Sequence, residues 1–449
     1  MRLTFHGGAG SVTGANYLLD AGGEKILIDC GLLQGSHFAE RQNFEPFPYD
    51  PSAIRAVIIT HAHLDHVGRL PRLYEGGFRG IIFSTAPTKD FAELILLDSE
   101  HILMKEAERE GKPPLTSPES IQGVMGLWKV VDYHAPFMVG PFKVELYDAG
   151  HILGSSMVKI DAERNTVVFS GDLGNYPAPM IRSTEQFTRA DYCVIESTYG
   201  DRAHGETEER REELENVIED TAKQGGVLMI PAFAMERTQE LLYHLHELFE
   251  QGRIPPLPVY IDSPLAIKMT QVYRRYRSFL NKESAAHVRE RDDILHFPNL
   301  HFTPTTEESK KINDVPPPKI IIAGSGMSQG GRILHHERRY LSDQKSTILF
   351  VGFQSHGSLG RRILEGAKTV TLFGEEVPVR CRVRSIPAYS AHADQPRLLQ
   401  WITPLRTSLK RVFVVQGEEE SAGVLAQKLR DTLALSAHIP KAGETVVLE

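Results

Sequence analysis

The chain has 449 residues, 41% hydrophobic and 24% charged, which are the proportions of a folded protein with more than one core. A net charge of −8 excludes nucleic-acid binding through overall charge, so such a partner would need a local basic surface. Three widely spaced cysteines exclude a disulfide framework and predict a cytoplasmic protein, and no apolar run reaches the roughly 18 residues that span a membrane.

The first half of the chain is predicted to consist of strands whose ends carry polar side chains. The apolar run at 56–60 predicts a buried strand that leads directly into the sequence His-Ala-His-Leu-Asp-His at 61–66. Other predicted strands deliver Asp29, His151, Asp172 and Glu196 at their ends. Layered folds of strands and helices group their active-site side chains in this way. The sequence therefore predicts one shared site.

The segment 61–66 has the composition of a zinc site, because imidazole nitrogens and carboxylates suit that metal. In an extended chain, His61 and His63 project to the same side, and the next two ligand-type residues lie one turn further on. Two zinc ions are expected, the second starting at Asp65 and His66. The first would be held by three nitrogens, and one carboxylate would bridge the pair: His61, His63 and His151, with Asp172.

Two further side chains are expected to support the chemistry without being primary ligands. Asp29 is expected to orient a metal-bound histidine, a common role for a neighbouring carboxylate. His392, in a polar segment after a strand, is a candidate general acid. Glu196 is its expected partner, because a nearby carboxylate keeps an imidazole protonated near pH 7.

From about residue 201, strands and helices alternate strictly, which predicts a parallel sheet flanked by helices. We expect domains at 1–200 and 377–449 with a second domain, 201–376, between them. In that domain, the glycine-rich segment 324–332 could hold a phosphate, or could be an ordinary turn. Basic clusters lie at 274–277, 361–362 and 380–384; each alone is typical of a solvated face, and together they could line a groove for a polyanion.

These motifs resemble the metallo-β-lactamase fold, an α/β hydrolase fold with four αββα layers. Four further motifs are similar to those of the β-CASP nucleases, which insert an α/β domain into that fold. They are Glu196-Ser197-Thr198-Tyr199, Pro231-Ala232-Phe233-Ala234, Asp262-Ser263-Pro264 and Ser390-Ala391-His392. The resemblance covers essentially the whole chain, and points to the prokaryotic relatives of the nuclease subunit of the cleavage and polyadenylation specificity factor.

The resemblance implies a zinc-dependent ribonuclease that hydrolyses phosphodiester bonds in single-stranded RNA. A metal-bound hydroxide would attack the phosphorus, and protonated His392 would assist the leaving oxygen. The implied catalytic residues are His392, Glu196, Asp65 and Asp29. The expected substrate contacts are Ser325, Gly326, Met327, Arg332, Arg237 and Ser263. Endonuclease and 5′-exonuclease action both remain open, as do DNA as a second substrate and a homodimer.

One residue departs from the family pattern. The family has His-Gly-Glu after its last strand and uses that histidine as a ligand to the second zinc, whereas this chain has Gln416-Gly417-Glu418. A glutamine amide offers only a neutral, weak oxygen, so the second site is expected to be weakened. The alternatives are an RNA-binding scaffold with little or no catalysis and a metallo-hydrolase of small thioesters or lactams.

Overall fold

The computed structural model describes residues 1–35, 41–111, 113–204, 207–289, 295–352, 354–355, 357–386 and 389–449. The chain divides into two compact units. Unit 1 comprises Met1–Ala178, Arg182–Ala203 and His392–Glu449; unit 2 comprises Pro179–Ile181 and His204–Ala391. Among the described residues, no helix is both long enough and apolar enough to span a bilayer.

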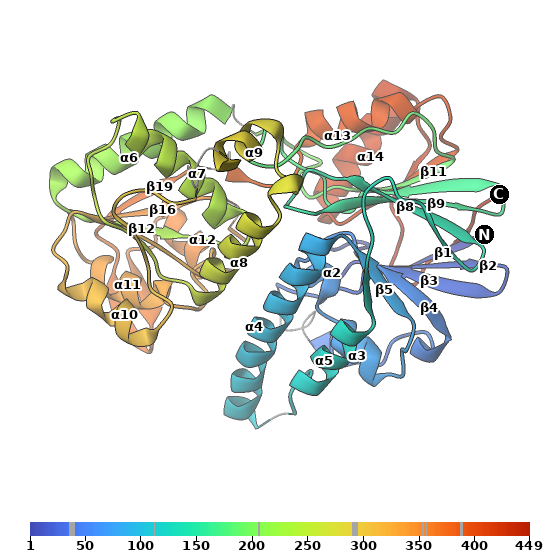
Figure 1. Cartoon of the computed structure of the whole chain (residues 1–449), viewed down its shortest axis with the longest axis horizontal. Helices are drawn as coiled ribbons and strands as arrows, with labels where there is room; N and C mark the ends of the chain where they lie inside the picture. The colour runs from blue at the N-terminus through green and yellow to red at the C-terminus, as the bar shows by residue number, and fades with distance from the viewer. Residues whose placement is uncertain are drawn as a thin grey trace. The chain divides into compact units, whose positions relative to one another are not determined.

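Unit 1 contains two seven-stranded sheets (Figure 1). The first has the order β22 (Thr445–Val447), β1 (Arg2–Gly7), β2 (Asn16–Ala21), β3 (Glu24–Ile28), β4 (Ile54–Ile58), β5 (Ile81–Ser84) and β6 (Trp128–Val130). The second has the order β21 (Ala437–His438), β20 (Arg411–Val415), β11 (Tyr192–Glu196), β10 (Asn165–Phe169), β9 (Ser156–Ala162), β8 (Phe142–Asp148) and β7 (Phe137–Val139).

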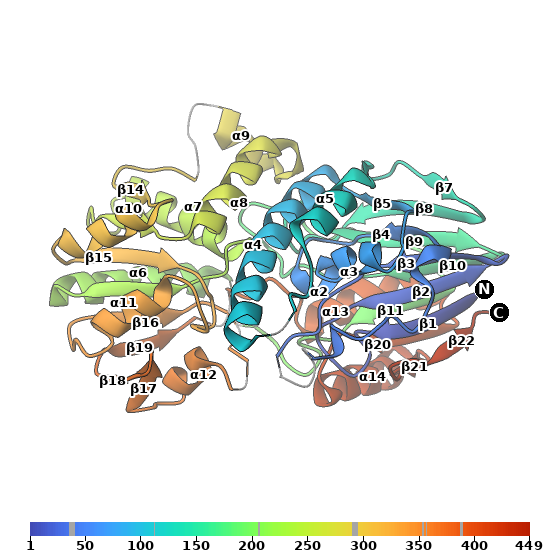
Figure 2. The same cartoon turned by 90° about the horizontal axis from the view of Figure 1, so that it is seen from below.

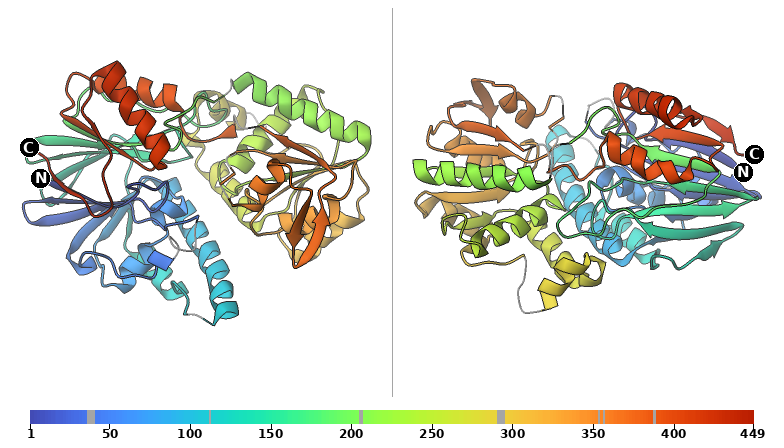
Figure 3. Two further views of the ribbon diagram at one scale, coloured as in Figure 1. Left: turned by 180° about the vertical axis from the view of Figure 1, so that it is seen from behind. Right: turned by 90° about the horizontal axis from the view of Figure 1, so that it is seen from above.

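Helices cover the outer face of each sheet of unit 1, which makes four layers (Figures 1 and 3). The first sheet carries α2 (Leu64–Val67), α3 (Leu70–Glu75), α4 (Ala86–Glu110) and α5 (Pro118–Gly126), and the second carries α13 (Gln395–Ile402) and α14 (Glu419–Leu433). Apolar side chains from both sheets, including Phe5, Phe142 and Phe413, form the core between them. The predicted four-layer αββα fold is confirmed.

In each sheet of unit 1, the carboxyl ends of neighbouring parallel strands lie at the same edge. β10, β11 and β20 are neighbours and run parallel, as do β3 and β4 in the other sheet. β11 is buried along its whole length, and an uninterrupted apolar run is typical of a parallel strand covered on both faces. The polar residues that follow these strands therefore come out together, as the sequence predicts.

Unit 2 is built on a parallel six-stranded sheet. Its order is β14 (Leu300–Phe302), β13 (Val259–Ile261), β15 (Lys319–Ala323), β12 (Val227–Pro231), β16 (Thr347–Phe350) and β19 (Arg382–Ser385). α6 (Thr207–Gln224) lies on one face, and α10 (Thr306–Lys311) and α11 (Ile333–Tyr340) lie on the other (Figures 1 and 2). The predicted inserted α/β architecture is confirmed.

The remaining elements are four helices, one hairpin and single 3-10 turns among the described residues. Unit 2 also contains α7 (Arg237–Glu250), α8 (Pro264–Arg275), α9 (Lys282–Arg289), α12 (Leu359–Leu364) and the hairpin of β17 (Thr369–Leu372) with β18 (Glu375–Pro378). Single 3-10 turns lie at Pro51–Ala53, Arg277–Phe279, Ile312–Asp314 and Thr403–Leu405.

The compact second unit continues to Ala391, beyond the expected boundary at residue 376. The reason is β19, which pairs in parallel with β16 from Thr347↔Arg382 to Phe350↔Ser385. The strand is only half-buried and rich in arginine, so its sequence lacks the apolar pattern of a sheet strand. The basic cluster at 380–384 thus belongs largely to an edge strand of this sheet.

Candidate metal centre

Four of the predicted ligand atoms in unit 1 lie close together: His61 Nε2, His63 Nδ1, His151 Nε2 and Asp172 Oδ2, all within 4.8 Å of one another. His63 Nδ1 lies 3.0 Å from His61 Nε2 and 3.2 Å from His151 Nε2. Asp172 Oδ2 lies 3.3 Å from His61 Nε2 and 3.6 Å from His151 Nε2.

These spacings fit a tetrahedral zinc ion. Zinc bonds of roughly 2.1 Å in tetrahedral geometry separate neighbouring donor atoms by about 3.4 Å. Four of the six separations among these atoms, from 3.0 to 3.6 Å, bracket that value, and all six are within 4.8 Å. Burial lowers the pKa of His63 and His151 well below the usual range, so both imidazoles stay neutral, the form that binds metal.

The two sheets of unit 1 come close together beside these side chains, where backbone atoms of one sheet contact those of the other. The N–H of Ser156 donates to the carbonyl of Thr60 at 2.7 Å, which joins β9 to the segment that follows β4. Gly171, just before Asp172, has φ +53°, and a Cβ there would lie 2.9 Å from the Thr60 side chain. Glycine is therefore required at this position, because any larger residue would separate the histidine segment from Asp172.

Asp29 supports the centre from behind, as expected of an orienting carboxylate. Its Oδ1 accepts from the N–H of Thr60 at 2.8 Å, and its Oδ2 accepts from the Thr60 hydroxyl at 2.8 Å. The same Oδ2 lies 2.8 Å from Nδ1 of His66. Asp29 is 1% exposed and adopts φ +60°, a conformation that aspartate and asparagine tolerate better than most residues.

The residues expected at a second ion include Gln416. Nε2 of His66 lies 3.7 Å from Asp65 Oδ2 and 3.4 Å from Asp172 Oδ1. The amide nitrogen of Gln416 lies 2.9 Å from the same His66 nitrogen and 3.1 Å from the same Asp172 oxygen. The glutamine side chain is therefore inserted among the donors that the second ion would use.

His392 and Glu196 form the expected pair beside Asp172. His392 Nδ1 lies 3.2 Å from Glu196 Oε2, and Glu196 is completely buried. Its other oxygen, Oε1, accepts from the N–H of Leu173 at 2.6 Å. Burial opposes a charge on His392, but Glu196 and Asp172 outweigh that effect and raise its pKa to about 9.

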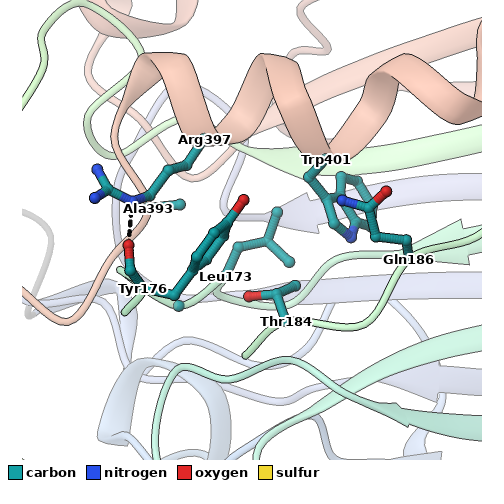
Figure 4. Close-up of a pocket in the computed structure, with 8 residues that line it drawn as sticks. Leu173, Tyr176, Thr184, Gln186, Ala393, Arg397 and Trp401 are labelled. Carbon is teal, nitrogen blue, oxygen red and sulfur yellow. Dashed lines mark hydrogen bonds between the residues drawn. The ribbon is translucent and has the colours of Figure 1, made fainter. Parts of the chain in front are cut away.

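The segment that follows His392 is tied to the loop that follows Asp172. The N–H of Ala393 donates to the carbonyl of Leu173 at 2.7 Å. Arg397, on α13, donates from Nε to the carbonyl of Tyr176 at 2.7 Å (Figure 4). Trp401 lies on the same helix, among the residues that line this region. These contacts fix the position of His392 relative to Asp172.

Several expected substrate contacts have structural partners within unit 2. Arg237 is 5% exposed and is paired with Glu240, which also accepts from Arg210 at 2.7 Å. Arg332 donates to Asp262 Oδ1 at 2.8 Å, and Ser263 caps α8 by accepting from the N–H of Ala266. All three side chains are thus engaged within unit 2, and their contact with substrate stays a prediction.

The glycine-rich segment folds on itself. The hydroxyl oxygen of Ser325 accepts from the N–H groups of Gln329 and Gly330 at 3.0 and 3.2 Å. Met327 accepts a hydrogen bond at its sulfur from Ser355, and a Cβ at Gly326 would lie 2.7 Å from the Phe233 ring. The segment has a defined shape that depends on glycine.

Unit 2 also contains a basic cavity that the sequence analysis missed. It has a volume of about 530 Å³ and is lined by Thr306, Ser309, Lys310, Asn313, Arg332, His335, His336, Arg338 and Arg339. The sequence features that could have indicated this cavity are the basic residues in the last turns of α10 and α11, but only the fold brings the two helices together.

Comparison with known proteins decides the family. Residues 10–78 match the metallo-β-lactamase superfamily, 238–363 the β-CASP domain, and 376–440 the Zn-dependent metallo-hydrolase RNA specificity domain. Ribonuclease TTHA0252 of Thermus thermophilus is 38% identical over 96% of both chains. The chain belongs to the β-CASP branch of the metallo-β-lactamase superfamily. The predicted family is thereby confirmed.

Other relatives match less completely. The transcription termination factor FttA of Methanocaldococcus jannaschii is 30% identical over 98% of this chain and 70% of its own length. A protein of unknown function from Enterococcus faecalis, known from a crystal structure, has a TM-score of 0.57 and 14% identity, covering 100% of this chain and 99% of its own. That likeness shows the fold alone.

Proposed function

We propose that the protein is a zinc-dependent ribonuclease that hydrolyses phosphodiester bonds in single-stranded RNA. The observation that carries the proposal is the cluster of four donor atoms with tetrahedral spacing beside the His392–Glu196 pair. The match to a protein named ribonuclease, over 96% of both chains, supports RNA as the substrate. The three cysteines are free and buried, which supports a reducing compartment, the cytoplasm.

The ion would be held by His61, His63, His151 and Asp172, whose donor set and spacing fit zinc. When bound, zinc supplies Lewis acidity that makes water a competent nucleophile near neutral pH. Asp29 acts behind these residues, where it holds Thr60 and His66 in position. The whole arrangement lies within unit 1.

His392 is assigned the proton donation to the leaving oxygen. Its raised pKa, about 9, keeps the ring protonated at neutral pH. Because Nδ1 of His392 is hydrogen-bonded to Glu196, we assign the donated proton to Nε2 of the same ring. Glu196 is therefore a positioning residue, which aims the ring and supports its charge, and such proton transfer contributes about 10²–10⁴-fold to a rate.

For substrate binding, we propose contacts with the backbone of the segment that contains Ser325, Gly326 and Met327. The basic cavity near Arg332 adds a surface suited to phosphates, with Lys310 and Arg339 among its lining residues. The side chains of Arg237, Ser263 and Arg332 are engaged within the fold, so the proposal does not depend on them.

The non-catalytic alternative, an RNA-binding scaffold, has one observation in its favour. Gln416 replaces a family ligand and lies among the donors of the second expected ion. The four donors of the first ion are nevertheless all present with suitable spacing. Cleavage with one ion is therefore the better-supported proposal.

One assay tests the proposal and its rivals. Labelled linear and circular single-stranded RNA, a thioester and a lactam are incubated with the purified protein, with and without a chelator. We expect cleavage of both RNAs only, lost with chelator and restored by zinc. Cutting of circular RNA would identify endonuclease action, whereas binding without cutting would favour the scaffold.

Two variants sharpen that assay. His63→Ala removes one of the four donors and is expected to lower both zinc content and cleavage at least 100-fold. Glu196→Gln is expected to lower cleavage about 10²–10⁴-fold with zinc content unchanged. His101→Ala, an exposed histidine on α4, is the matched control and should behave as the parent protein. Full cleavage by His63→Ala would contradict the proposed site.

A further inference from the structure

The orientation of the Gln416 amide follows from its neighbours. Asp172 Oδ1 is a carboxylate oxygen and can only accept hydrogen bonds. It lies 3.1 Å from one end of the amide, so that end must be the NH₂ group. The reverse orientation would set two acceptor oxygens against each other. The other end, Oε1, accepts from the hydroxyl of Tyr17, at 3.4 Å.

With this orientation, one chain of hydrogen bonds satisfies the whole region. Asp29 Oδ2 accepts from Nδ1–H of His66 at 2.8 Å, so in the neutral ring Nε2 of His66 is an acceptor. The Gln416 amide supplies one hydrogen to that Nε2, at 2.9 Å, and the other to Asp172. Gln416, His66 and Asp172 are each 2% exposed or less, so water does not compete for these bonds.

The same lone pairs are those that a second ion would need. Nε2 of His66 and Oδ1 of Asp172 both point at the amide nitrogen, and the amide oxygen faces Tyr17 instead. Gln416 therefore offers no ligand atom to this position. The donors present do not fit a second ion, unlike the four donors of the first site.

We infer that the centre binds a single metal ion, and that the Gln416 amide takes the place of the second. The amide then does two things that a second ion would otherwise do. It holds the His66 ring, and it holds Oδ1 of Asp172 so that Oδ2 faces His61 and His151. Asp172 becomes a one-ion ligand held by a hydrogen bond. The inference rests on the proposed metal site but not on RNA as the substrate.

The main chain at Gln416 is held by hydrogen bonds on both sides. Gln416 follows β20 directly and has φ +48°. Its N–H donates to the carbonyl of Gly8 at 2.6 Å, and its carbonyl accepts from the Thr198 hydroxyl at 3.1 Å. With the main chain fixed on both sides, a second ion would have to displace the side chain within a buried space.

The test counts ions without measuring activity. The parent protein is stripped with chelator, reloaded with zinc and analysed by native mass spectrometry, and Co²⁺ titration followed by absorption gives an independent count. We expect one ion per chain. Gln416→His supplies an imidazole nitrogen, Gln416→Glu supplies a carboxylate of the same shape, and each is expected to take up two ions.

The controls separate the possible failures. Gln251→His, at an exposed position after α7, reports adventitious binding by a new histidine and should keep one ion. Two ions in the parent protein would overturn the inference and leave the proposed function intact. No ion in the parent would overturn the proposed metal site itself. One ion in both Gln416 variants would overturn the role given to the amide.

Discussion

At the scale of single residues, Asp29 shows how much one buried carboxylate can hold in place. It accepts three hydrogen bonds, two from Thr60 and one from His66, and it lies directly behind the candidate metal centre. A buried donor that loses its partner costs about 1–3 kcal/mol. Stability and metal affinity are therefore coupled at this position.

Replacement of Asp29 should separate these contributions. Asp29→Ala leaves both Thr60 donors unpaired and places at φ +60° a residue that tolerates this conformation less well than aspartate, so we expect a loss of about 2–4 kcal/mol in unfolding free energy. Asp29→Asn keeps one acceptor and tolerates the backbone, so its loss should be smaller. Both should weaken zinc binding about 10–100-fold. Chemical denaturation and zinc titration measure the two effects, and equal stability of the two variants would contradict this account.

Residues whose position follows from the strand pattern could be predicted from the sequence, whereas those whose contacts depend on the fold could not. His61, His63, His151 and Asp172 follow strands, and the carboxyl ends of parallel strands share an edge, so sequence position was sufficient. Arg237 and Glu240 have the i,i+3 spacing of neighbours on a helix, whereas the approach of Arg210 to the same carboxylate depends on the fold and could not be predicted. The direction of the Gln416 amide likewise depends on Tyr17, His66 and Asp172, which only the fold assembles.

At the scale of elements, helix α11 carries a buried acid against the glycine-rich segment. Glu337 is completely buried, and one of its oxygens accepts from the Ser328 hydroxyl. Its other oxygen, Oε2, has no hydrogen-bond partner among the described residues. Burial raises the pKa of Glu337 from 4.5 to about 8.

This pKa predicts how stability should depend on pH. The folded protein binds the Glu337 proton more tightly than the unfolded chain, so this contribution to stability is complete below about pH 4.5 and is lost as pH rises toward 8. Each pKa unit is worth about 1.4 kcal/mol, so the effect reaches several kcal/mol. Glu337→Gln keeps the shape and removes the titration. Its melting temperature should equal that of the parent near pH 5 and exceed it increasingly from pH 6 to 9.

The matched control for that measurement is Glu376→Gln, at an exposed position on β18. It should leave the pH dependence of the melting temperature unchanged. If Glu337→Gln melts at the same temperature as the parent protein at pH 9, the buried acid does not carry the predicted penalty.

Strand β19 marks where element prediction reached its limit. Strands buried on both faces, such as β11 and β15, can be recognised in the sequence because they are apolar runs. β19 lies at the sheet edge with a half-exposed, arginine-rich sequence, so neither an apolar run nor a clean alternation identifies it. The compact unit extends to Ala391 because it includes this strand, whereas the matched RNA specificity domain begins at residue 376, next to the predicted boundary.

At the scale of the whole molecule, all the proposed metal ligands lie in unit 1. A ligand that binds only the folded state stabilises it by about 4 kcal/mol at a thousandfold excess over its dissociation constant. Zinc should therefore stabilise unit 1 selectively.

Hydrogen exchange followed by mass spectrometry can check this selectivity. On removal of zinc, we expect faster exchange in peptides that cover β4, β10 and the segment 61–66. Peptides from β12 and β15 in unit 2 should exchange at unchanged rates. Re-addition of zinc provides the control, since it should restore protection. An equal loss of protection in both units would contradict the selective effect.

The pairing of β11 with β20 has a consequence for folding during translation. β11 ends at Glu196, yet its neighbour β20 begins only at Arg411, after all of unit 2 has been made. On the ribosome, the four donors of the first ion therefore emerge long before His392 and Gln416 do. A nascent chain thus contains the proposed zinc ligands early, whereas the proposed proton donor, His392, is added only when translation is nearly over. Under the proposed function, a chain still being translated would therefore lack the proton donor for RNA cleavage until it is almost complete.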